Sequence, residues 1–286
     1  MLKLNNRVTL PINHFPDGTL LLDAEAFFDT KNYDLDDLNH VEIYWKFENN
    51  EEFLALGCYT MHLREHGFKH ITLNMPYIPN ARQDRVKTEN DVHTLKYFAK
   101  AINLLGFDEV KVLDPHSAVS EGLINNIRIA TPDKYVISAI NDIHAYASER
   151  GFRIDPSDLT LFFPDEGAMK RYSNISKLMP YTFGIKDRVW KTGDIKGLDI
   201  AGNIEENIKN KNILIVDDIS SKGGTFYHSA LKLKSLGAQK VFLFVTHCEN
   251  TIKDGELLKN NDLIERIYCT NSLITIEDEK IHVFNL

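Results

Sequence analysis

Two adjacent carboxylates, Asp217 and Asp218, stand directly before a short loop of small residues, 220–225. Such a loop would expose backbone N–H groups at the positive end of a helix dipole, where phosphate binds well. The carboxylates would repel a phosphate, and they suit hydroxyl groups or a magnesium ion instead. A phosphate loop beside a hydroxyl-binding acidic pair indicates a site for a ribose phosphate.

A strand and a helix must hold these groups in place. The apolar run 213–216 is typical of a strand buried on both faces, as in a parallel sheet. After the loop, apolar residues recur at helical spacing, at Phe226, Ala230, Leu233 and Leu236. Gly237 follows where such a helix would end. The sequence therefore predicts a strand, a loop and a helix in this order.

This stretch resembles the phosphoribosyl-pyrophosphate (PRPP) signature that type I phosphoribosyltransferases share with PRPP synthetases. In that signature an apolar strand leads to two acidic residues and then to a loop ending in Gly-Gly-Thr or Ala-Gly-Thr. The resemblance implies that Asp217 and Asp218 hold the 2- and 3-hydroxyls of the ribose. It also implies a set of residues around the phosphate: Ser221, Lys222, Gly223, Gly224 and Thr225.

Bulk properties narrow the class of protein. The 286 residues are enough for two α/β domains, and the net charge of −8 argues against a general nucleic-acid binder. Cys58, Cys248 and Cys269 show no metal-site spacing and no even disulfide set, which predicts reduced thiols in a cytoplasmic protein. The sequence contains no apolar run of about 18 residues, so no membrane partner is expected.

A second polar segment, 76–85, follows the strand predicted at 70–75. It closely resembles the Pro-Tyr-Ala-Arg-Gln-Asp-Arg segment of the PRPP synthetases, which the transferases lack, with Asn80 in place of a tyrosine. In the synthetases the Arg-Gln pair contacts ATP and the basic residues after it meet the phosphates, a role that suits arginine. The resemblance implies an ATP-binding set: Arg82, Gln83, Arg85 and Lys87.

The turn chemistry of Pro-Asp-Gly at residues 16–18 has a further possible role. It resembles the Phe-x-Asp-Gly-Glu turn with which PRPP synthetases reach the adenine of ATP, usually across a subunit interface. The resemblance implies that Phe15 and Asp17 contact ATP. Thr19 stands where the family usually has glutamate.

His116 and Asp165 each follow a predicted strand, 109–113 and 159–163. In the PRPP synthetases a histidine in an Asp-x-His segment binds the magnesium that holds ATP. An aspartate in a Pro-Asp-x-Gly loop binds magnesium beside the pyrophosphate. The resemblance therefore implies Mg²⁺ as cofactor, with His116 and Asp165 as its ligands across the two domains. Gly167 would let a polyanion approach the main chain.

A candidate catalytic pair follows the strand predicted at 181–185. The PRPP synthetases have Lys-Arg-Arg here, at the root of a mobile loop, and its first and third residues clamp the migrating diphosphoryl group. Lys186 and Arg188 hold these two places, and Asp187 stands between them. Lys191 is the alternative to this pair.

Strands and helices alternate along the chain, which favours parallel sheets. Together with the resemblance, this predicts an α/β fold of two similar type I phosphoribosyltransferase-like domains, each a mainly parallel sheet flanked by helices. Residues 1–137 would form the ATP side and residues 138–286 the ribose phosphate side. The helix predicted at 51–65 is expected to turn four residues inward: Leu54, Cys58, Met61 and Leu63.

The resemblance runs from about residue 8 to 286. Family members generally continue into a C-terminal helix, whereas this chain ends after a strand predicted at 281–284. Because of that departure, the sequence does not predict whether the chain has the higher oligomer and the allosteric site that are usual in the family. A homo-oligomer, a dimer or higher, is the expected assembly.

The predicted function is transfer of the β,γ-diphosphoryl group of ATP to the anomeric hydroxyl of ribose 5-phosphate, which gives PRPP and AMP. One alternative keeps this chemistry but uses a larger 5-substituted ribose such as ADP-ribose, whose additional phosphate could meet Lys222. Two alternatives come from other classes. A phosphoribosyltransferase would have no use for an ATP segment, and a non-catalytic synthetase-associated protein would lose loop and metal residues.

Overall fold

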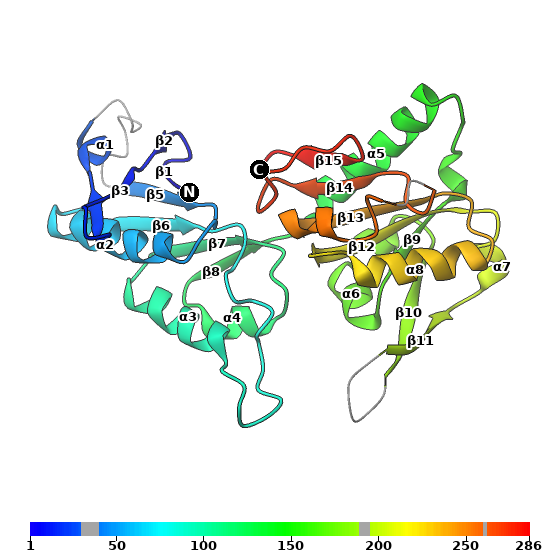
Figure 1. Cartoon of the computed structure of the whole chain (residues 1–286), viewed down its shortest axis with the longest axis horizontal. Helices are drawn as coiled ribbons and strands as arrows, with labels where there is room; N and C mark the ends of the chain where they lie inside the picture. Colours follow the sequence, from blue (N-terminus) through cyan, green and yellow to red (C-terminus); the bar gives the residue numbers. More distant parts are fainter. Residues whose placement is uncertain (30–39, 189–194, 260–261) are drawn as a thin grey trace. The chain divides into compact units, whose positions relative to one another are not determined.

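A computed structural model describes four stretches of the chain: 1–29, 40–188, 195–259 and 262–286. Within residues 186–188 and 195–198 it describes the backbone alone. The chain divides into two compact units, Met1–Thr131 and Pro132–Leu286 (Figure 1). The boundary predicted between residues 137 and 138 lies a few residues further on, inside helix α5 (Asp133–Glu149).

A six-stranded sheet in the order β2-β1-β5-β6-β7-β8 forms the first unit. Four neighbouring strands are parallel: β5 (His40–Trp45), β6 (His70–Asn74), β7 (Glu109–Leu113) and β8 (Ile127–Ala130). Two short strands extend the sheet in antiparallel pairing: β1 (Leu2–Leu4) and β2 (Val8–Thr9). The connecting helices are α2 (Glu51–Glu65), α3 (Thr94–Leu104) and α4 (Val119–Leu123). Before them come the separate hairpin β3 (Ile12–His14) and β4 (Leu20–Leu22), and α1 (Glu25–Phe28).

Helix α2 has its predicted bounds, but its predicted buried face is only partly correct. Leu63 is buried, whereas Leu54 and Met61 are 61% and 57% exposed. The apolar face that the helix buries is formed by other residues at helical spacing, among them Leu56 and Tyr59. On the same face lies the buried Glu52, whose carboxylate accepts a hydrogen bond of 2.9 Å from the indole N–H of Trp45 and contacts the amino group of Met1.

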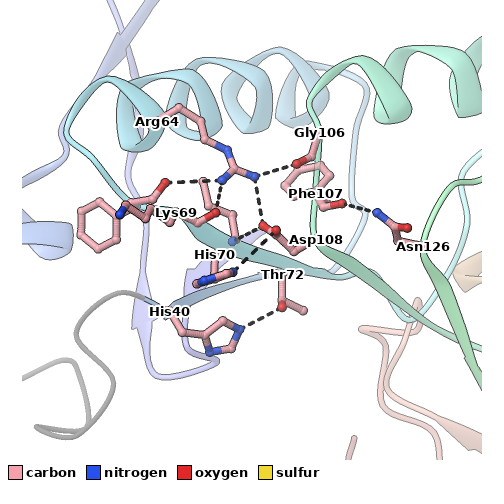
Figure 2. Close-up of polar contacts among 11 residues, drawn as sticks. His40, Arg64, Lys69, His70, Thr72, Gly106, Phe107, Asp108 and Asn126 are labelled. Carbon is pink, nitrogen blue, oxygen red and sulfur yellow. Dashed lines mark hydrogen bonds and ion pairs between the residues drawn. The ribbon is translucent and has the colours of Figure 1, made fainter.

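Arg64, in the last turn of α2, ties together the loops that precede β6 and β7 (Figure 2). Its guanidinium donates to the backbone carbonyls of Phe68, Lys69 and Gly106, and to the Asp108 carboxylate at 3.1 Å. Asp108 also accepts the backbone N–H at the start of β6. Arg64 therefore fixes the amino edge of the sheet, at the opposite ends of the strands from the predicted ATP segment.

A seven-stranded sheet in the order β11-β10-β9-β12-β13-β14-β15 forms the second unit. Its strands are β9 (Leu159–Phe163), β10 (Tyr181–Arg188), β11 (Ile195–Ala201), β12 (Asn212–Ser220), β13 (Val241–Cys248), β14 (Ile267–Thr270) and β15 (Ile281–Phe284). All neighbours are parallel except β10 and β11. The helices are α5, α6 (Glu166–Arg171), α7 (Ile204–Asn207) and α8 (Gly224–Ser235).

The predicted mainly parallel sheet flanked by helices is confirmed in each unit (Figure 1). The central strands are near-continuously buried because helices cover both faces of such a sheet. In β12 the apolar run 213–216 is fully buried, as its composition predicted. No helix in the described stretches is both long and apolar enough to span a bilayer.

Candidate active site

The acidic residues predicted for the second unit meet at the carboxyl ends of two adjacent strands. β9 and β12 pair in parallel, with Ile215 opposite Phe162, so Asp165 follows one strand end while Asp217 and Asp218 occupy the other. The carboxyl ends of parallel strands are where α/β sheets bind ligands. The fold thus brings Asp165 close to the consecutive pair Asp217 and Asp218, from which it is distant in sequence.

Asp217 and Asp218 have different environments although they are neighbours. Desolvation, reinforced by the carboxylates of Asp218 and Asp165, raises the pKa of Asp217 well above its usual range. Asp218 is only 4% exposed and forms an ion pair of 2.9 Å with Arg171, from the last turn of α6. Asp218 is therefore neutralised by the protein. No salt bridge to Asp217 is found among the side chains that the structure describes, and Asp217 retains part of its surface for a ligand.

The loop after β12 has the geometry expected of a phosphate loop. Gly223 has φ +77° and directly precedes α8, whose first turn carries no acidic residue. A Cβ at Gly223 would overlap the side chain of Leu257, and a Cβ at Gly255 would overlap the carbonyl oxygen of Lys222. The Ser221 hydroxyl lies 3.0 Å from the hydroxyl of Thr251. The loop is therefore shaped by a close approach of the segment after β13, which only glycine permits at two positions.

Asp165 also begins helix α6. Its Oδ1 accepts the backbone N–H of Ala168 at 3.0 Å, which is ordinary N-cap geometry. Gly167, in the first turn, packs closely against this carboxylate: a Cβ there would lie 3.2 Å from Asp165 Oδ1. One oxygen of Asp165 thus organises the turn, and the absence of a side chain at Gly167 lets the turn close around it.

In the first unit, two predicted motifs converge on Asp84, which is 6% exposed. Burial by itself would raise the pKa of Asp84, but the Ser117 hydroxyl, the guanidinium of Arg85 and the charge of His116 together lower it. Arg85 Nε lies 3.1 Å from Asp84 Oδ1. The segment after β6 and the segment after β7 therefore share one buried carboxylate, which links the predicted phosphate-binding arginine to the predicted metal ligand.

The other predicted ATP residues of this segment lie on the surface. Gln83 is exposed, and its Oε1 accepts a hydrogen bond of 2.7 Å from Thr94, the first residue of α3. Arg82 and Lys87 are exposed as well. Their side chains can reach a solvent-borne anion from the carboxyl edge of the sheet.

Phe15 and Asp17 lie in the turn of the β3–β4 hairpin. Phe15 is 48% exposed, and the Asp17 carboxylate accepts from both the backbone N–H and the hydroxyl of Thr19. The hydroxyl bond is the larger cause of a lowered pKa for Asp17. Thr19 therefore stabilises the turn, and Phe15 remains available for contact.

The donor chemistry fits magnesium only as a partly protein-bound ion. Among the described residues, no three His, Cys, Asp or Glu side chains are grouped closely enough to hold a metal ion. Magnesium commonly uses one or two protein ligands and completes its shell with water and substrate phosphates. His116 in the first unit and Asp165 in the second agree with that mode, each as a single ligand at a strand end.

The predicted catalytic pair is only partly described. Lys186 and Arg188 belong to β10, where they pair with Leu198 and Ile195 of β11, and a register shift falls between Asp187 and Arg188. Their side chains lie outside the described part of the chain, as does all of Lys191.

Sequence reasoning missed several residues that shape the site: Asp84, Thr251, Gly255 and Leu257. Each acts by contact with a predicted residue, and none belongs to the quoted motif strings except Asp84. Arg171 was accessible from sequence only as a positive charge shortly after the Asp165 loop, and its pairing with Asp218 is visible only in the fold.

These features together define a two-domain α/β protein of the type I phosphoribosyltransferase class. The PRPP synthetase of Mycobacterium smegmatis has a similar fold, with a TM-score of 0.72 over 97% of this chain and 86% of that one, at 16% identity. No family model matches the chain.

Sequence relatives define the family. The ribose-phosphate pyrophosphokinase of Pyrococcus furiosus is 30% identical over 219 residues, which cover 74% of this chain and 70% of the relative. That of Pyrococcus abyssi is 28% identical over 286 residues, covering 97% and 88%. The chain belongs to the ribose-phosphate pyrophosphokinase family, a family of transferase enzymes.

Proposed function

We propose that this chain transfers the β,γ-diphosphoryl group of ATP to the anomeric hydroxyl of ribose 5-phosphate. The products are PRPP and AMP. The observation that carries the proposal is the arrangement at the end of β12, where a ligand-accessible carboxylate adjoins a glycine loop at a helix N-terminus. That arrangement suits a sugar hydroxyl and a phosphate held a few bonds apart.

On the acceptor side, Asp217 and Asp218 bind the two ring hydroxyls, and the loop 221–225 binds the 5-phosphate. The pKa of Asp217 is raised above that of an ordinary carboxyl, because burial removes it from water and because its neighbours are negative. Hydrogen bonds donated by the sugar hydroxyls favour the carboxylate form and so offset this repulsion. Arg171 keeps Asp218 charged and oriented throughout.

On the donor side, Arg82, Gln83, Arg85 and Lys87 bind ATP, with Asp84 holding Arg85 in place. Phe15 and Asp17 contact ATP from the hairpin. His116 and Asp165 would hold magnesium, which when bound neutralises charge on the phosphates. The proposed division of labour assigns ATP to the first unit and ribose phosphate to the second.

In the reaction, the anomeric oxygen bonds to the β-phosphorus while the bond from that phosphorus to the α-bridging oxygen breaks. AMP leaves with that oxygen, and the hydroxyl proton passes to water. Positioning and charge neutralisation supply most of the rate in such transfers. Lys186 and Arg188 are assigned to neutralise the migrating group.

The direct test is release of AMP from ATP, measured with and without ribose 5-phosphate. The proposal expects release that requires the acceptor and produces PRPP in equal amount. If the chain does not bind ATP, the result would favour a phosphoribosyltransferase. Stoichiometric binding to an active synthetase without AMP release would favour a non-catalytic associated protein. The same preparation would give the mass of the assembly, for which a homo-oligomer is proposed.

One observation favours a second acceptor. Lys222 is exposed in the phosphate loop, and its backbone is fixed by the close approach of Gly255. A fixed cation at this point would meet an additional phosphate on a 5-substituted ribose such as ADP-ribose. The assay therefore includes ADP-ribose. If Lys222→Met lowers use of ADP-ribose more than it lowers use of ribose 5-phosphate, the larger acceptor is supported. Release with ribose 5-phosphate alone rules the larger acceptor out.

A further inference from the structure

A pocket of about 320 Å³ lies in the first unit, between the first turns of α2 and α3. Phe53 lines it from α2, and Tyr97 and Ala101 line it from α3. It is close to the carboxyl ends of β5 and β6, the edge at which α/β sheets bind ligands. Among the described residues, none of those assigned to ATP is part of its lining.

The walls of the pocket are aromatic. Trp45 is fully buried at its floor, and its ring lies 6.2 Å from that of Phe53 in a stacked arrangement and 6.1 Å from that of Phe98. Tyr97 is 60% exposed, so a large aromatic side chain stands at the rim without being covered. An exposed aromatic ring above an aromatic floor is suited to a flat ring rather than to an aliphatic chain.

Two amides complete the pocket. Asn50 precedes α2 but makes no side-chain cap of that helix, and Asn80 is held at φ +65° beside Pro79. An amide offers a donor and an acceptor side by side, which matches the hydrogen-bonding edge of a nucleobase. Apolar walls with a few polar groups, at this volume, are typical of small-molecule sites.

We propose that this pocket binds one planar heteroaromatic ring, the base of a second nucleotide, and that it is separate from the ATP donor site. The idea of a second nucleotide rests on the proposed function, because the donor is assigned to other residues. Thr94 connects the two, since it lines the pocket and donates to Gln83. The base could belong to an acceptor such as ADP-ribose or to a free purine nucleotide.

The probe is adenosine, which lacks the phosphates that the proposed catalytic residues would bind. Its binding to the full chain is measured by calorimetry with a non-hydrolysable ATP analogue at saturation. We expect one equivalent to bind. Ala101→Phe, which fills the pocket, should weaken binding at least tenfold. The matched control is Leu104→Phe, which adds the same ring on α3 at a side chain that is 79% exposed and outside the lining, and it should bind as wild type does.

Failure of adenosine to bind while the ATP analogue is at saturation, or undiminished binding by Ala101→Phe, would overturn the proposal. Should Ala101→Phe fail to fold, Tyr97→Ala removes an exposed ring and should weaken binding severalfold; unchanged binding there would overturn it equally. Displacement by ADP-ribose but not ribose 5-phosphate would support the acceptor as source of the base, and displacement by AMP alone would support a free nucleotide. AMP release by Ala101→Phe, measured in parallel, tests the proposed function independently.

Discussion

Arg171 Nη1 lies 2.9 Å from Asp218 Oδ1, and no such cation faces the adjacent Asp217 among the described contacts. One ion pair thus stabilises the charged form of Asp218 but not that of the neighbouring Asp217. The ion pair with Arg171 keeps Asp218 ionised without a ligand. Asp217 lies in an environment that raises its pKa, and it ionises more readily once a ligand binds. Two predictions separate these roles.

Asp217→Asn should make the protein more stable at neutral pH and a poorer enzyme. The folded-state pKa of Asp217 is raised above its ordinary 3.8, so between these values the folded chain binds more protons than the unfolded chain. Stability conferred by this group therefore falls as pH rises through that window. The variant should lose this decline in urea unfolding followed against pH, and its KM for ribose 5-phosphate should rise about 10- to 100-fold.

Asp218→Asn is the matched comparison and should behave in the opposite way. It leaves Arg171 without its charged partner, so the free energy of unfolding should fall by about 1–3 kcal/mol at neutral pH. Equal stability changes for the two variants would contradict the distinction between them.

Gly223→Ala should damage the phosphate loop. The residue has φ +77°, and its new methyl would overlap Leu257, so a loss of about 1–3 kcal/mol is expected, with a raised KM for the acceptor. Adding Leu257→Ala should relieve the overlap but not the backbone strain. In a double-mutant cycle followed by thermal unfolding, the double variant should therefore lose less stability than the sum of the losses in the two single variants. Strictly additive losses of stability would show that the two residues are not in contact.

Asp84→Asn should weaken ATP and magnesium binding together. The carboxylate of Asp84 orients Arg85 and lies near His116, and loss of a group that holds a metal ligand typically lowers affinity about 10- to 100-fold. Titration calorimetry with ATP at several magnesium concentrations measures this. Glu89→Gln, an exposed acid in the same loop, should have no effect. A decrease in ATP affinity that is the same at every magnesium concentration would show that Asp84 does not act through His116.

Arg64→Met should destabilise the first unit without changing the kinetics. It removes the hydrogen bonds to the loops before β6 and β7, for an expected loss of about 1–3 kcal/mol. Arg128→Met is the control, because that guanidinium is 74% exposed and meets Glu109 only at 3.4 Å, a pair expected to contribute about 0–1 kcal/mol. An altered KM for either substrate in Arg64→Met would show that the amino edge communicates with the site.

Lys186→Ala should lower turnover about 10²- to 10³-fold with little change in ATP affinity, if this lysine neutralises charge that develops during transfer. Single-turnover AMP release and equilibrium ATP binding separate these quantities. The control is Lys177→Ala, at an exposed lysine of the same unit. Unchanged turnover in Lys186→Ala would remove it from the mechanism and return attention to Lys191.

Several elements could be predicted from sequence because local signals bound them. β7 and β9 occupy the residues predicted. β7 alternates charged and apolar residues, β9 is mainly apolar, and each strand is followed by a Pro-containing turn. The acidic pair and the glycine loop were also accessible, because their chemistry depends on residues that are consecutive in the chain. The family resemblance then ordered these motifs correctly, and the fold is confirmed.

Residues that act through distant contacts were not predictable in this way. The buried Glu52 of α2 has Trp45 and Met1 as partners, and no apolar count within the helix reveals them. Leu257 and Arg171 are common residue types in unremarkable strings. Their importance arises only when the fold places them against Gly223 and Asp218.

Asn80 carries a consequence for engineering. It occupies the left-handed region at φ +65°, which asparagine tolerates and a bulky aromatic residue disfavours by about 1–2 kcal/mol. The tyrosine typical of the resembling segment therefore does not graft onto this backbone as a point substitution. An exchange of this segment with a relative would therefore have to replace the stretch 76–85 as a whole, because its main-chain path depends on the residue at position 80.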